Sequence, residues 1–579
     1  MKVLLSGNEA VARGAYEAGV RVATAYPGTP STEILENIAR YDEIYAQWSV
    51  NEKVAFEVAI GASMAGVRAL VAMKHVGLNV AADPLMTASY VGCRGGLVLV
   101  SADDPGMHSS QNEQDNRAYA KMAKIPMLEP SDSQEAKDFV VRAFQISEEF
   151  DTPVMVRMTT RICHGKSPVV EAEPQQVAPK GYEKDVKKYV MIPGHARLRH
   201  VAVEERRLKL EQYTERFEHN AIEMNDPCLG IISSGVAFQY AREAFPEASV
   251  LKLGMTHPLP SKMIGDFAGR VEKLYAVEEL EPYLEDQIKA LGIPVVGKEV
   301  LPRVGELSPE IVRDAIGAVK TNRAAQGDAA DLPARPPAMC PGCPHRGLFY
   351  VLWRLKLTVT GDIGCYTLSV LPPLQTMDLC ICMGASIGTA LGMEKALGPE
   401  ASEHTVAVLG DSTFIHSGIT GLVDVVYNRS NVTVIVLDNR TTAMTGHQEN
   451  PGTGRTLKGE RTHPFDFVAV GKAIGIDNPR VVDPYDLEAT EQVVREEVAR
   501  RGPSLIVSRR ECVLLVRDRA RLSRVDAELC VGCKLCLRLG CPALSMSDEM
   551  AVIDPLLCFG CGVCAQVCSK GAVFIEDRM

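Results

Sequence analysis

Residues 409–444 read LGDSTFIHSGITGLVDVVYNRSNVTVIVLDNRTTAM. The apolar run 406–409 leads into this segment and predicts a buried parallel strand that ends at a Gly-Asp turn. A helical pattern follows from about residue 417 to 427, and residues 432–437 predict a second buried strand that ends at an Asp-Asn pair. Such a strand–helix–strand unit is typical of an open α/β sheet, in which ligands bind at the carboxyl ends of the strands.

Polar groups at these two strand ends match the needs of a divalent cation that bridges a diphosphate. Mg²⁺ takes about six oxygen ligands, of which the protein supplies only a few. Asp411 offers a carboxylate, Asn439 an amide oxygen and Thr441 its backbone carbonyl. The small neighbours Gly410 and Ser412 allow backbone N–H groups to approach phosphate oxygens. A lone Gly-Asp turn is more often an ordinary strand end, so the prediction depends on the strand, the helix and the Asn together.

The same segment resembles the thiamine diphosphate motif, in which GDG is followed by a helix, a strand and NN. The chain departs from this motif at two positions, because Ser412 replaces the second Gly and Asp438 replaces the first Asn. The two metal-ligand positions of the motif, Asp411 and Asn439, are retained. The resemblance implies thiamine diphosphate and Mg²⁺ as cofactors, and it places Gly384 of the Met-Gly-Ala-Ser helix opening in the same pocket.

The first 185 residues alternate between strand and helix patterns, which predicts a doubly wound α/β domain. Strands are expected at 20–26, 67–74 and 96–101, and a helix at 52–64. Glu52 opens this helix, where the helix dipole favours a Glu in any case. Thiamine chemistry gives it another interpretation, because a carboxylic acid must hydrogen-bond the aminopyrimidine ring before the thiazolium C2 proton can be removed. A Glu in a largely apolar pocket suits that task.

Two stretches decide between these interpretations. Residues 48–66 (WSVNEKVAFEVAIGASMAG) resemble the catalytic-Glu helix of 2-oxoacid:ferredoxin oxidoreductases. Residues 26–31 (YPGTPS) resemble the YPITPSS-type loop of the same family, so the resemblance favours a catalytic Glu52 and makes Thr29 a candidate substrate contact. His75, in an expected loop at KHVGLN, could move a proton or bind a substrate carboxylate, or could be a hydrogen-bonded structural His. His447 is a further candidate pocket residue.

Cysteines near the start of the second half suggest another cofactor. Cys340 and Cys343 form a C-x-x-C pair, which suits either one edge of a metal cluster or a redox-active dithiol. In the related oxidoreductases, a CPGC pair, a GIGC cysteine and a distant fourth cysteine hold a [4Fe–4S] cluster close to the thiamine. The resemblance assigns the remaining positions to Cys365 and Cys512. Some relatives lack this cluster, so the sequence leaves the third cluster open.

The carboxy-terminal cysteines give the strongest pattern in the chain. Two C-x₂-C-x₂-C triplets are each followed by a further Cys, and such a triplet wraps three corners of a [4Fe–4S] cubane while the other half supplies the fourth thiolate. Two clusters are therefore predicted, one held by Cys530, Cys533, Cys536 and Cys568, and the other by Cys541, Cys558, Cys561 and Cys564. The first repeat has four residues instead of three before Cys541, and Ser569 stands where bacterial ferredoxins have Pro. Zinc is the rival interpretation.

The length, net charge and apolar runs of the chain exclude several classes of function. The chain has 579 residues and a net charge of −11, which argues against nucleic acid as a partner. No apolar run reaches the roughly 18 residues of a membrane span, so no membrane partner is expected. The apolar start is too short for a signal peptide. A cytoplasmic location follows as an expectation, with the 17 cysteines as thiols or ligands instead of disulfides.

Pattern and resemblance together divide the chain into six segments. They are a pyrimidine-binding thiamine domain (1–185), a helical connector (186–225), a transketolase carboxy-terminal-like α/β domain (226–322), a linker (323–337), a diphosphate-binding thiamine domain (338–517) and a ferredoxin-type domain with two [4Fe–4S] clusters (520–579).

The resemblance covers nearly the whole chain and implies one reaction, the oxidative decarboxylation of a 2-oxoacid with coenzyme A and oxidised ferredoxin. Fusion of both thiamine halves to a ferredoxin domain is similar to the alpha subunits of the branch that acts on aryl pyruvates such as indolepyruvate. That branch works as a hetero-oligomer with a smaller beta subunit, with two copies of each expected. Three alternatives stay open: another 2-oxoacid substrate, a non-redox thiamine decarboxylase, and an electron-transfer subunit.

Overall fold

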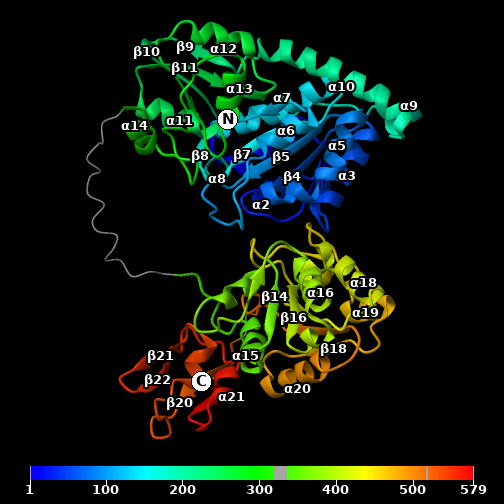
Figure 1. The fold of residues 1–579 in the computed structure, drawn as a ribbon, viewed down its shortest axis with the longest axis vertical. Coiled ribbons are helices and arrows are strands. Elements are labelled where there is room, and N and C mark those ends of the chain that lie inside the picture. Colours follow the sequence, from blue (N-terminus) through cyan, green and yellow to red (C-terminus); the bar gives the residue numbers. More distant parts are fainter. Residues whose placement is uncertain (1, 318–335, 517–518, 578–579) are drawn as a thin grey trace. The chain divides into compact units, whose positions relative to one another are not determined.

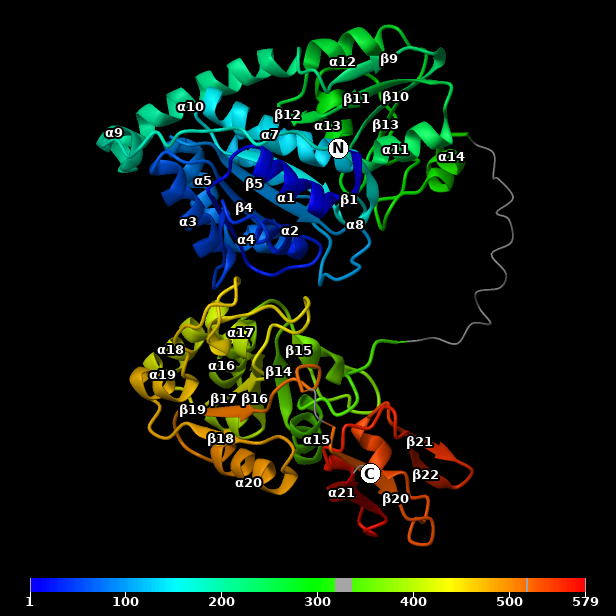
Figure 2. The same cartoon turned by 180° about the vertical axis from the view of Figure 1, so that it is seen from behind.

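The computed structural model describes residues 2–317, 336–516 and 519–577. The chain divides into two compact units, Met1–Asp331 and Leu332–Met579 (Figures 1 and 2). The predicted linker at 323–337 lies outside the described residues, apart from its last two positions. No helix in the described parts is long and apolar enough to cross a membrane.

A seven-stranded sheet forms the centre of the first unit, in the order β12-β6-β7-β5-β4-β2-β3. All neighbours are parallel except β12 and β6. The strands are β2 (Val22–Ala25), β3 (Tyr45–Trp48), β4 (Ala69–Lys74), β5 (Leu97–Asp103), β6 (Met127–Leu128), β7 (Val154–Thr159) and β12 (Met255–His257). The helices are α1 (Gly7–Glu17), α2 (Thr32–Ile38), α3 (Glu52–Met64), α4 (His75–Val80), α5 (Ala82–Val91), α6 (Arg117–Ala123), α7 (Ser133–Phe150) and α8 (Thr160–His164). A separate pair joins β1 (Lys2–Ser6) to β8 (Lys166–Val170).

A second, four-stranded sheet completes this unit, in the order β13-β10-β11-β9. Its strands are β9 (Ala221–Glu223), β10 (Asp226–Ser234), β11 (Ala248–Leu253) and β13 (Leu274–Val277), and its helices are α11 (Gly235–Ala244), α12 (Ser261–Ala268), α13 (Tyr283–Ala290) and α14 (Pro309–Gly317). The long helix α10 (Pro193–Thr214) follows the short α9 (Val186–Tyr189) and packs on α5 (Figure 2). One apolar core includes Phe56 and Leu99 together with Phe267 and Leu284, so the two sheets share their interior.

The second unit contains a fully parallel sheet in the order β15-β14-β16-β17-β19-β18. Its strands are β14 (Thr358–Gly361), β15 (Leu379–Cys380), β16 (Thr405–Gly410), β17 (Thr433–Asp438), β18 (Arg480–Val482) and β19 (Ser504–Arg509). Its helices are α15 (His345–Leu355), α16 (Ala385–Leu397), α17 (Asp411–Thr413), α18 (Ile419–Tyr427), α19 (Phe467–Ile474) and α20 (Leu487–Val498). β16 and β17 are adjacent at the centre, which brings the ends of both motif strands to one edge.

The carboxy-terminal part has two small antiparallel pairs. β20 (Arg521–Val525) pairs with β23 (Val573–Asp577), and β21 (Leu544–Ser547) pairs with β22 (Met550–Ile553). The 3-10 turn η6 (Leu535–Leu539) and α21 (Val563–Val567) complete it. Leu539 and Val563 share a core with Leu348 and Leu352 of α15. The carboxy-terminal part therefore packs directly on the domain that contains the fully parallel sheet (Figure 1).

The fold confirms the doubly wound α/β architecture and most predicted elements, and the helix predicted at 52–64 coincides with α3. Two local predictions were wrong. The stretch that begins at His75 is helix α4 instead of a loop. The helix after the Gly-Asp turn begins at Asp411 and not near 417, because α17 and a π-helical segment at Phe414–Gly418 precede α18.

Candidate active site and cluster sites

Glu52 is the first residue of α3 and is 5% exposed. The Asn51 side chain caps this helix by accepting a hydrogen bond of 2.9 Å from the Val54 N–H. Gly77 of α4 lies directly against the Glu52 carboxyl group, because a Cβ added at Gly77 would stand 2.5 Å from Glu52 Oε1. The KHVGLN stretch therefore covers Glu52, and its glycine is needed for that close approach.

Lys74 is a site residue that the sequence analysis missed. It ends β4, and a Cβ added at Gly28 would lie 3.0 Å from its Cγ, so its side chain runs along the YPGTPS loop. The ammonium group donates to the Ser109 carbonyl at 3.1 Å, and the Ser109 hydroxyl donates to the Thr29 carbonyl at 3.2 Å. Burial lowers the pKa of Lys74 to about 8, although the carboxylates of Asp104 and Glu52 oppose this shift. The Lys74 ammonium is therefore a cation that lies along the YPGTPS loop and close enough to Glu52 to feel its charge.

His75 is fully buried at the start of α4. Its Nε2 lies 3.2 Å from the Asn112 carbonyl, and Asn116 donates to the His75 backbone carbonyl at 3.1 Å. Burial, with a smaller effect of the Lys74 charge, lowers the pKa of His75 to about 4, so the ring is neutral at physiological pH. A structural His would make contacts of this kind. A proton-transfer role for His75 stays a prediction.

Asp411 follows β16 and is 3% exposed. Its Oδ1 accepts from the Ser412 N–H at 2.6 Å, whereas its Oδ2 is buried and has no hydrogen-bond partner. Burial, followed by the nearby Asp438 carboxylate, raises the pKa of Asp411 to about 7. At the end of the adjacent strand, Asn439 Oδ1 accepts from the Thr441 N–H at 3.3 Å. An orphaned carboxylate oxygen beside an amide oxygen is a donor set that fits a divalent cation.

Asp438, which stands where the motif has Asn, is neutralised by arginines. Its Oδ2 accepts from Arg509 Nε at 2.7 Å, and its Oδ1 lies 3.3 Å from Arg440 Nε. Arg509 is the last residue of the neighbouring strand β19. The departure from the motif is therefore compensated by an ion pair within the sheet.

Gly384 caps α16 with φ +88°, a conformation that favours glycine. A Cβ there would lie 2.7 Å from the Ser417 hydroxyl, which donates to the Met383 carbonyl at 3.0 Å. The backbone at Gly384 thus packs closely on the segment that follows Asp411. Cys382, two residues before Gly384, is exposed.

The four cysteines of the predicted third cluster interact electrostatically with one another. Burial raises the pKa of Cys343 to about 12, with further contributions from Cys340 and Cys365. Burial likewise raises the pKa of Cys365 to about 11, with contributions from Cys512 and Cys340. His447 lies at the same place, since its Nε2 is 3.8 Å from Cys512 Sγ. The structure therefore brings together thiols that are up to 172 positions apart (340 to 512) in the sequence.

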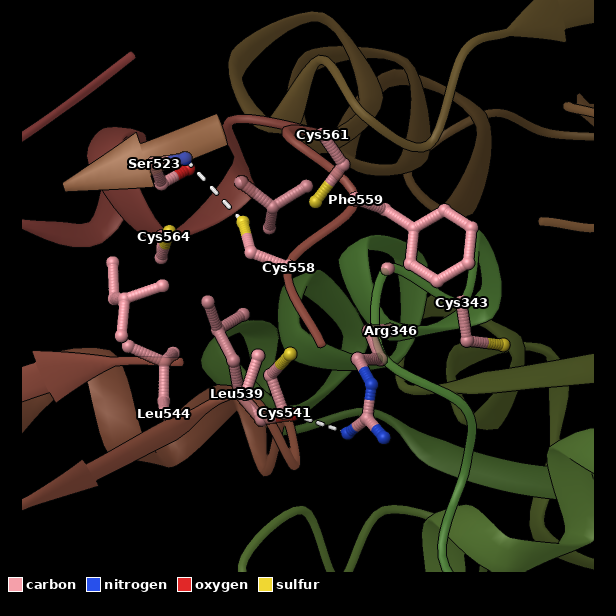
Figure 3. Close-up of a pocket in the computed structure, with 14 residues that line it drawn as sticks. Cys343, Arg346, Ser523, Leu539, Cys541, Leu544, Cys558, Phe559, Cys561 and Cys564 are labelled. Carbon is pink, nitrogen blue, oxygen red and sulfur yellow. Dashed lines mark hydrogen bonds between the residues drawn. The ribbon is translucent and has the colours of Figure 1, made fainter. Parts of the chain in front are cut away.

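The eight cysteines of the carboxy-terminal ferredoxin-type part, called the tail below, line two separate cavities. One cavity is lined by Cys541, Cys558, Cys561 and Cys564, together with Cys343 (Figure 3). The other is lined by Cys530, Cys533, Cys536 and Cys568. Nowhere in the described parts of the chain do three His, Cys, Asp or Glu side chains converge as a single metal ion would require. Four thiols around each cavity match the number of thiolate ligands of a [4Fe–4S] cluster.

Backbone groups also point toward this cluster site. The N–H groups of Ser523 and Gly560 both donate to Cys558 Sγ at 3.3 Å, the first of them drawn in Figure 3. Burial raises the pKa of Cys561 to about 11 and that of Cys564 to about 12. A positively charged cluster core would compensate the cost of these buried thiolates, as metal ions do when they deprotonate coordinating thiols.

Three segments of the chain match known protein families. Residues 13–225 match the family "Pyruvate flavodoxin/ferredoxin oxidoreductase, thiamine diP-bdg", and residues 362–508 match "Thiamine pyrophosphate enzyme, C-terminal TPP binding domain". Residues 551–574 match "4Fe-4S binding domain". A chain with both thiamine-binding domains and an iron–sulfur domain is a subunit of a thiamine-dependent ferredoxin oxidoreductase.

Full-length relatives give the family. The chain is 43% identical to indolepyruvate oxidoreductase subunit IorA of Pyrococcus horikoshii, over 99% of this chain and 96% of the relative. The identity is 41% to IorA of Archaeoglobus fulgidus and 41% to IorA of Methanothermobacter marburgensis, in each case over 99% of this chain and 97% of the relative. The chain belongs to the IorA family.

Proposed function

We propose that this chain catalyses the oxidative decarboxylation of indolepyruvate, with coenzyme A and oxidised ferredoxin as co-substrates. The products are the corresponding aryl-acetyl-CoA, CO₂ and reduced ferredoxin, and the two electrons leave singly through iron–sulfur clusters. Thiamine diphosphate, when bound, supplies the electron sink that makes loss of CO₂ feasible. The single observation that carries the proposal is the full-length identity to IorA proteins, which are named for indolepyruvate.

The thiamine residues divide by task. Glu52 holds the proton that the cofactor ring needs, and its burial excludes water from that proton. Asp411 and Asn439 bind Mg²⁺ through side-chain oxygens, and Thr441 binds it through its backbone carbonyl. Three small residues line the cofactor's diphosphate: Gly384, Gly410 and Ser412. Thr29, His75 and His447 are assigned to the substrate pocket from sequence.

The clusters are assigned by cavity and by thiol proximity. Two [4Fe–4S] clusters occupy the tail, each in one of the two cysteine-lined cavities. A third occupies the set Cys340, Cys343, Cys365 and Cys512, whose thiols interact with one another. The physiological partners are a smaller beta subunit, two copies of each subunit being expected, and ferredoxin.

Anaerobic reduction of a viologen dye by the purified chain with its beta subunit tests the reaction. We expect coenzyme-A-dependent reduction that prefers indolepyruvate over pyruvate and 2-oxoglutarate. Reduction with pyruvate alone would retain the mechanism and contradict the substrate. No reduction by a protein with intact thiamine and clusters would contradict the oxidoreductase function and leave a non-redox decarboxylase or an electron carrier.

We infer that the Lys74 ammonium binds the carboxylate of the 2-oxoacid. Replacement of Lys74 by Met should then raise KM about 10-fold or more, because such a charge-assisted hydrogen bond contributes about 1.5–3 kcal/mol. The Lys74 ammonium loses its proton as the pH rises through about 8, so KM of the wild type should increase above that pH. Lys74→Arg should keep the low KM and abolish this pH dependence. Steady-state kinetics from pH 6.5 to about 9 measure both effects.

Lys53→Met is the matched control for Lys74, because Lys53 is a more exposed lysine on α3 whose ammonium pairs with Glu57. It should leave KM unchanged. An unaltered KM in Lys74→Met would show that Lys74 does not contact the substrate.

Replacement of Cys365 by Ser should remove one of three clusters, so bound iron should fall by about a third while the tail clusters remain. Iron analysis and low-temperature EPR spectra of the dithionite-reduced chain measure this loss. Cys382→Ser is the control, since Cys382 is exposed and belongs to none of the three sets. Equal iron contents in wild type and Cys365→Ser would refute the third cluster.

A further inference from the structure

Arg346 is a buried cation in the first turn of α15, only 4% exposed. Its Nε donates to the Cys340 carbonyl at 3.2 Å, and its Nη2 donates to the Met339 carbonyl, so it binds the CPGC loop. Its Nη1 donates to the carbonyls of Leu539 at 2.8 Å and Gly540 at 2.5 Å, which belong to the ferredoxin-type part. All four acceptors are neutral, so these hydrogen bonds orient the guanidinium group without cancelling its charge.

The charge lies at one of the two cluster cavities. Arg346 lines the cavity of Cys541, Cys558, Cys561 and Cys564. Figure 3 shows its side chain with Cys541 on one side and Cys343 on the other. The thiols that act on Arg346 electrostatically are, in order of strength, Cys541, Cys343, Cys340 and Cys561, which belong to two predicted clusters.

The contact falls on the part of the tail that departs from the ferredoxin pattern. Four residues separate Cys536 from Cys541, and the last two of them, Leu539 and Gly540, supply the carbonyls that Arg346 binds. Gly540 has φ +63°, and a Cβ there would lie 2.8 Å from Pro373 Cδ and 3.3 Å from Arg346 Nη1. The longer loop thus carries Cys541 to the arginine, and a side chain at Gly540 would separate them.

The other cavity has no comparable buried charge among its lining residues. Its two cationic lining residues, Lys534 and Lys570, are both exposed, so solvent and salt screen their charges. A fixed charge in a protein interior acts more strongly, because the effective dielectric constant there is lower.

We propose that Arg346 raises the reduction potential of the cluster held by Cys541, Cys558, Cys561 and Cys564, which makes it the preferred electron acceptor of the tail. The inference rests on the proposed cluster assignment. In this transfer one electron would pass from the cluster assigned to Cys340, Cys343, Cys365 and Cys512, which would be oxidised, to this cluster, which would be reduced, and no covalent bond would form or break. The added negative charge is stabilised by the guanidinium group, which acts as a positioning and tuning residue and not as a ligand.

EPR-monitored redox titration of the full chain with its beta subunit tests this proposal. Arg346→Gln keeps hydrogen-bond donors and removes the charge, whereas Arg346→Lys keeps the charge and loses the planar fork. We expect Arg346→Gln to lower the reduction equilibrium constant of one tail cluster at least tenfold, equivalent to about 59 mV for one electron, with the other tail cluster unchanged. Arg346→Lys should retain most of the wild-type potential.

Arg354→Gln is the matched control, because Arg354 lies on the same helix but is half-exposed and pairs with Glu491. Iron content is measured for every variant. Unchanged potentials in Arg346→Gln with full iron content would overturn the proposal, and so would an equal fall in Arg346→Lys, because the charge would then not be the cause. Absence of iron from the wild-type tail would instead refute the cluster assignment itself.

Discussion

Replacement of Glu52 by Gln should reduce 2-oxoacid oxidation by a factor on the order of 10²–10⁴, the usual contribution of a positioned proton-transfer group. Gln has nearly the same shape as Glu, so it fits in the space that Gly77 leaves. A Cβ added at Gly77 would stand 2.5 Å from the Glu52 carboxyl oxygen. It cannot, however, hold and release the proton that the cofactor ring requires. We therefore expect kcat to fall while the fold and the iron content stay those of the wild type.

Glu57→Gln is the matched control for Glu52, because Glu57 is exposed on the same helix and pairs with Lys53. It should retain wild-type activity. Viologen reduction with saturating substrate and coenzyme A gives kcat, and the EPR spectra report the clusters. Full activity of Glu52→Gln would mean that the chain is an electron carrier or that another acid serves the cofactor.

Replacement of Asp411 by Asn should abolish binding of Mg²⁺ and thiamine diphosphate while it stabilises the cofactor-free protein. Burial and Asp438 raise the pKa of Asp411 in the folded state to about 7, above its ordinary value of 3.8. A carboxyl group with a raised folded-state pKa makes the folded protein less stable as the pH rises from about 4 to about 7, and the full penalty applies above that range. Asn carries no charge, so the variant avoids this penalty, which is on the order of a few kcal/mol.

Thermal unfolding of the full chain measures both effects. Without cofactor at pH 8, Asp411→Asn should have a higher Tm than the wild type, and the difference should vanish near pH 4. With Mg²⁺ and thiamine diphosphate, only the wild type should gain in Tm, because binding stabilises the folded state. Asp424→Asn, at an exposed position of α18, should behave like the wild type. A cofactor-induced rise in Tm of Asp411→Asn would remove Asp411 from the metal site.

The sequence predicted those parts of the molecule that follow from local pattern. The alternation of apolar strands with helices predicted the parallel sheet around β16 and β17, and the helical pattern at 52–64 predicted α3. The spacing of the tail cysteines predicted two groups, and each group lines one cavity. Whether each cavity holds a cluster stays a prediction.

The remaining features arise from contacts between distant residues. The ion pair of Asp438 with Arg509 joins neighbouring strands that are 71 positions apart (438 to 509), and no local pattern marks it. The sequence did not predict that Lys74 is partly buried, because a lysine at the end of a strand is commonly solvated. In the structure the YPGTPS loop covers it. The KHVGLN stretch was predicted as a loop because it follows a strand, but His75–Val80 form helix α4, in which Gly77 lies against Glu52.

The antiparallel strand β12 decides where this chain can be cut. In sequence it lies between β11 and β13 of the four-stranded sheet, yet it pairs with β6 and so forms the last strand of the seven-stranded sheet. A fragment that stops at residue 225, where the match to the thiamine family ends, would leave β6 as a bare edge and expose the shared core to water. Expression trials, limited proteolysis and domain exchange should therefore treat the amino-terminal unit as indivisible, although sequence comparison draws a boundary through it.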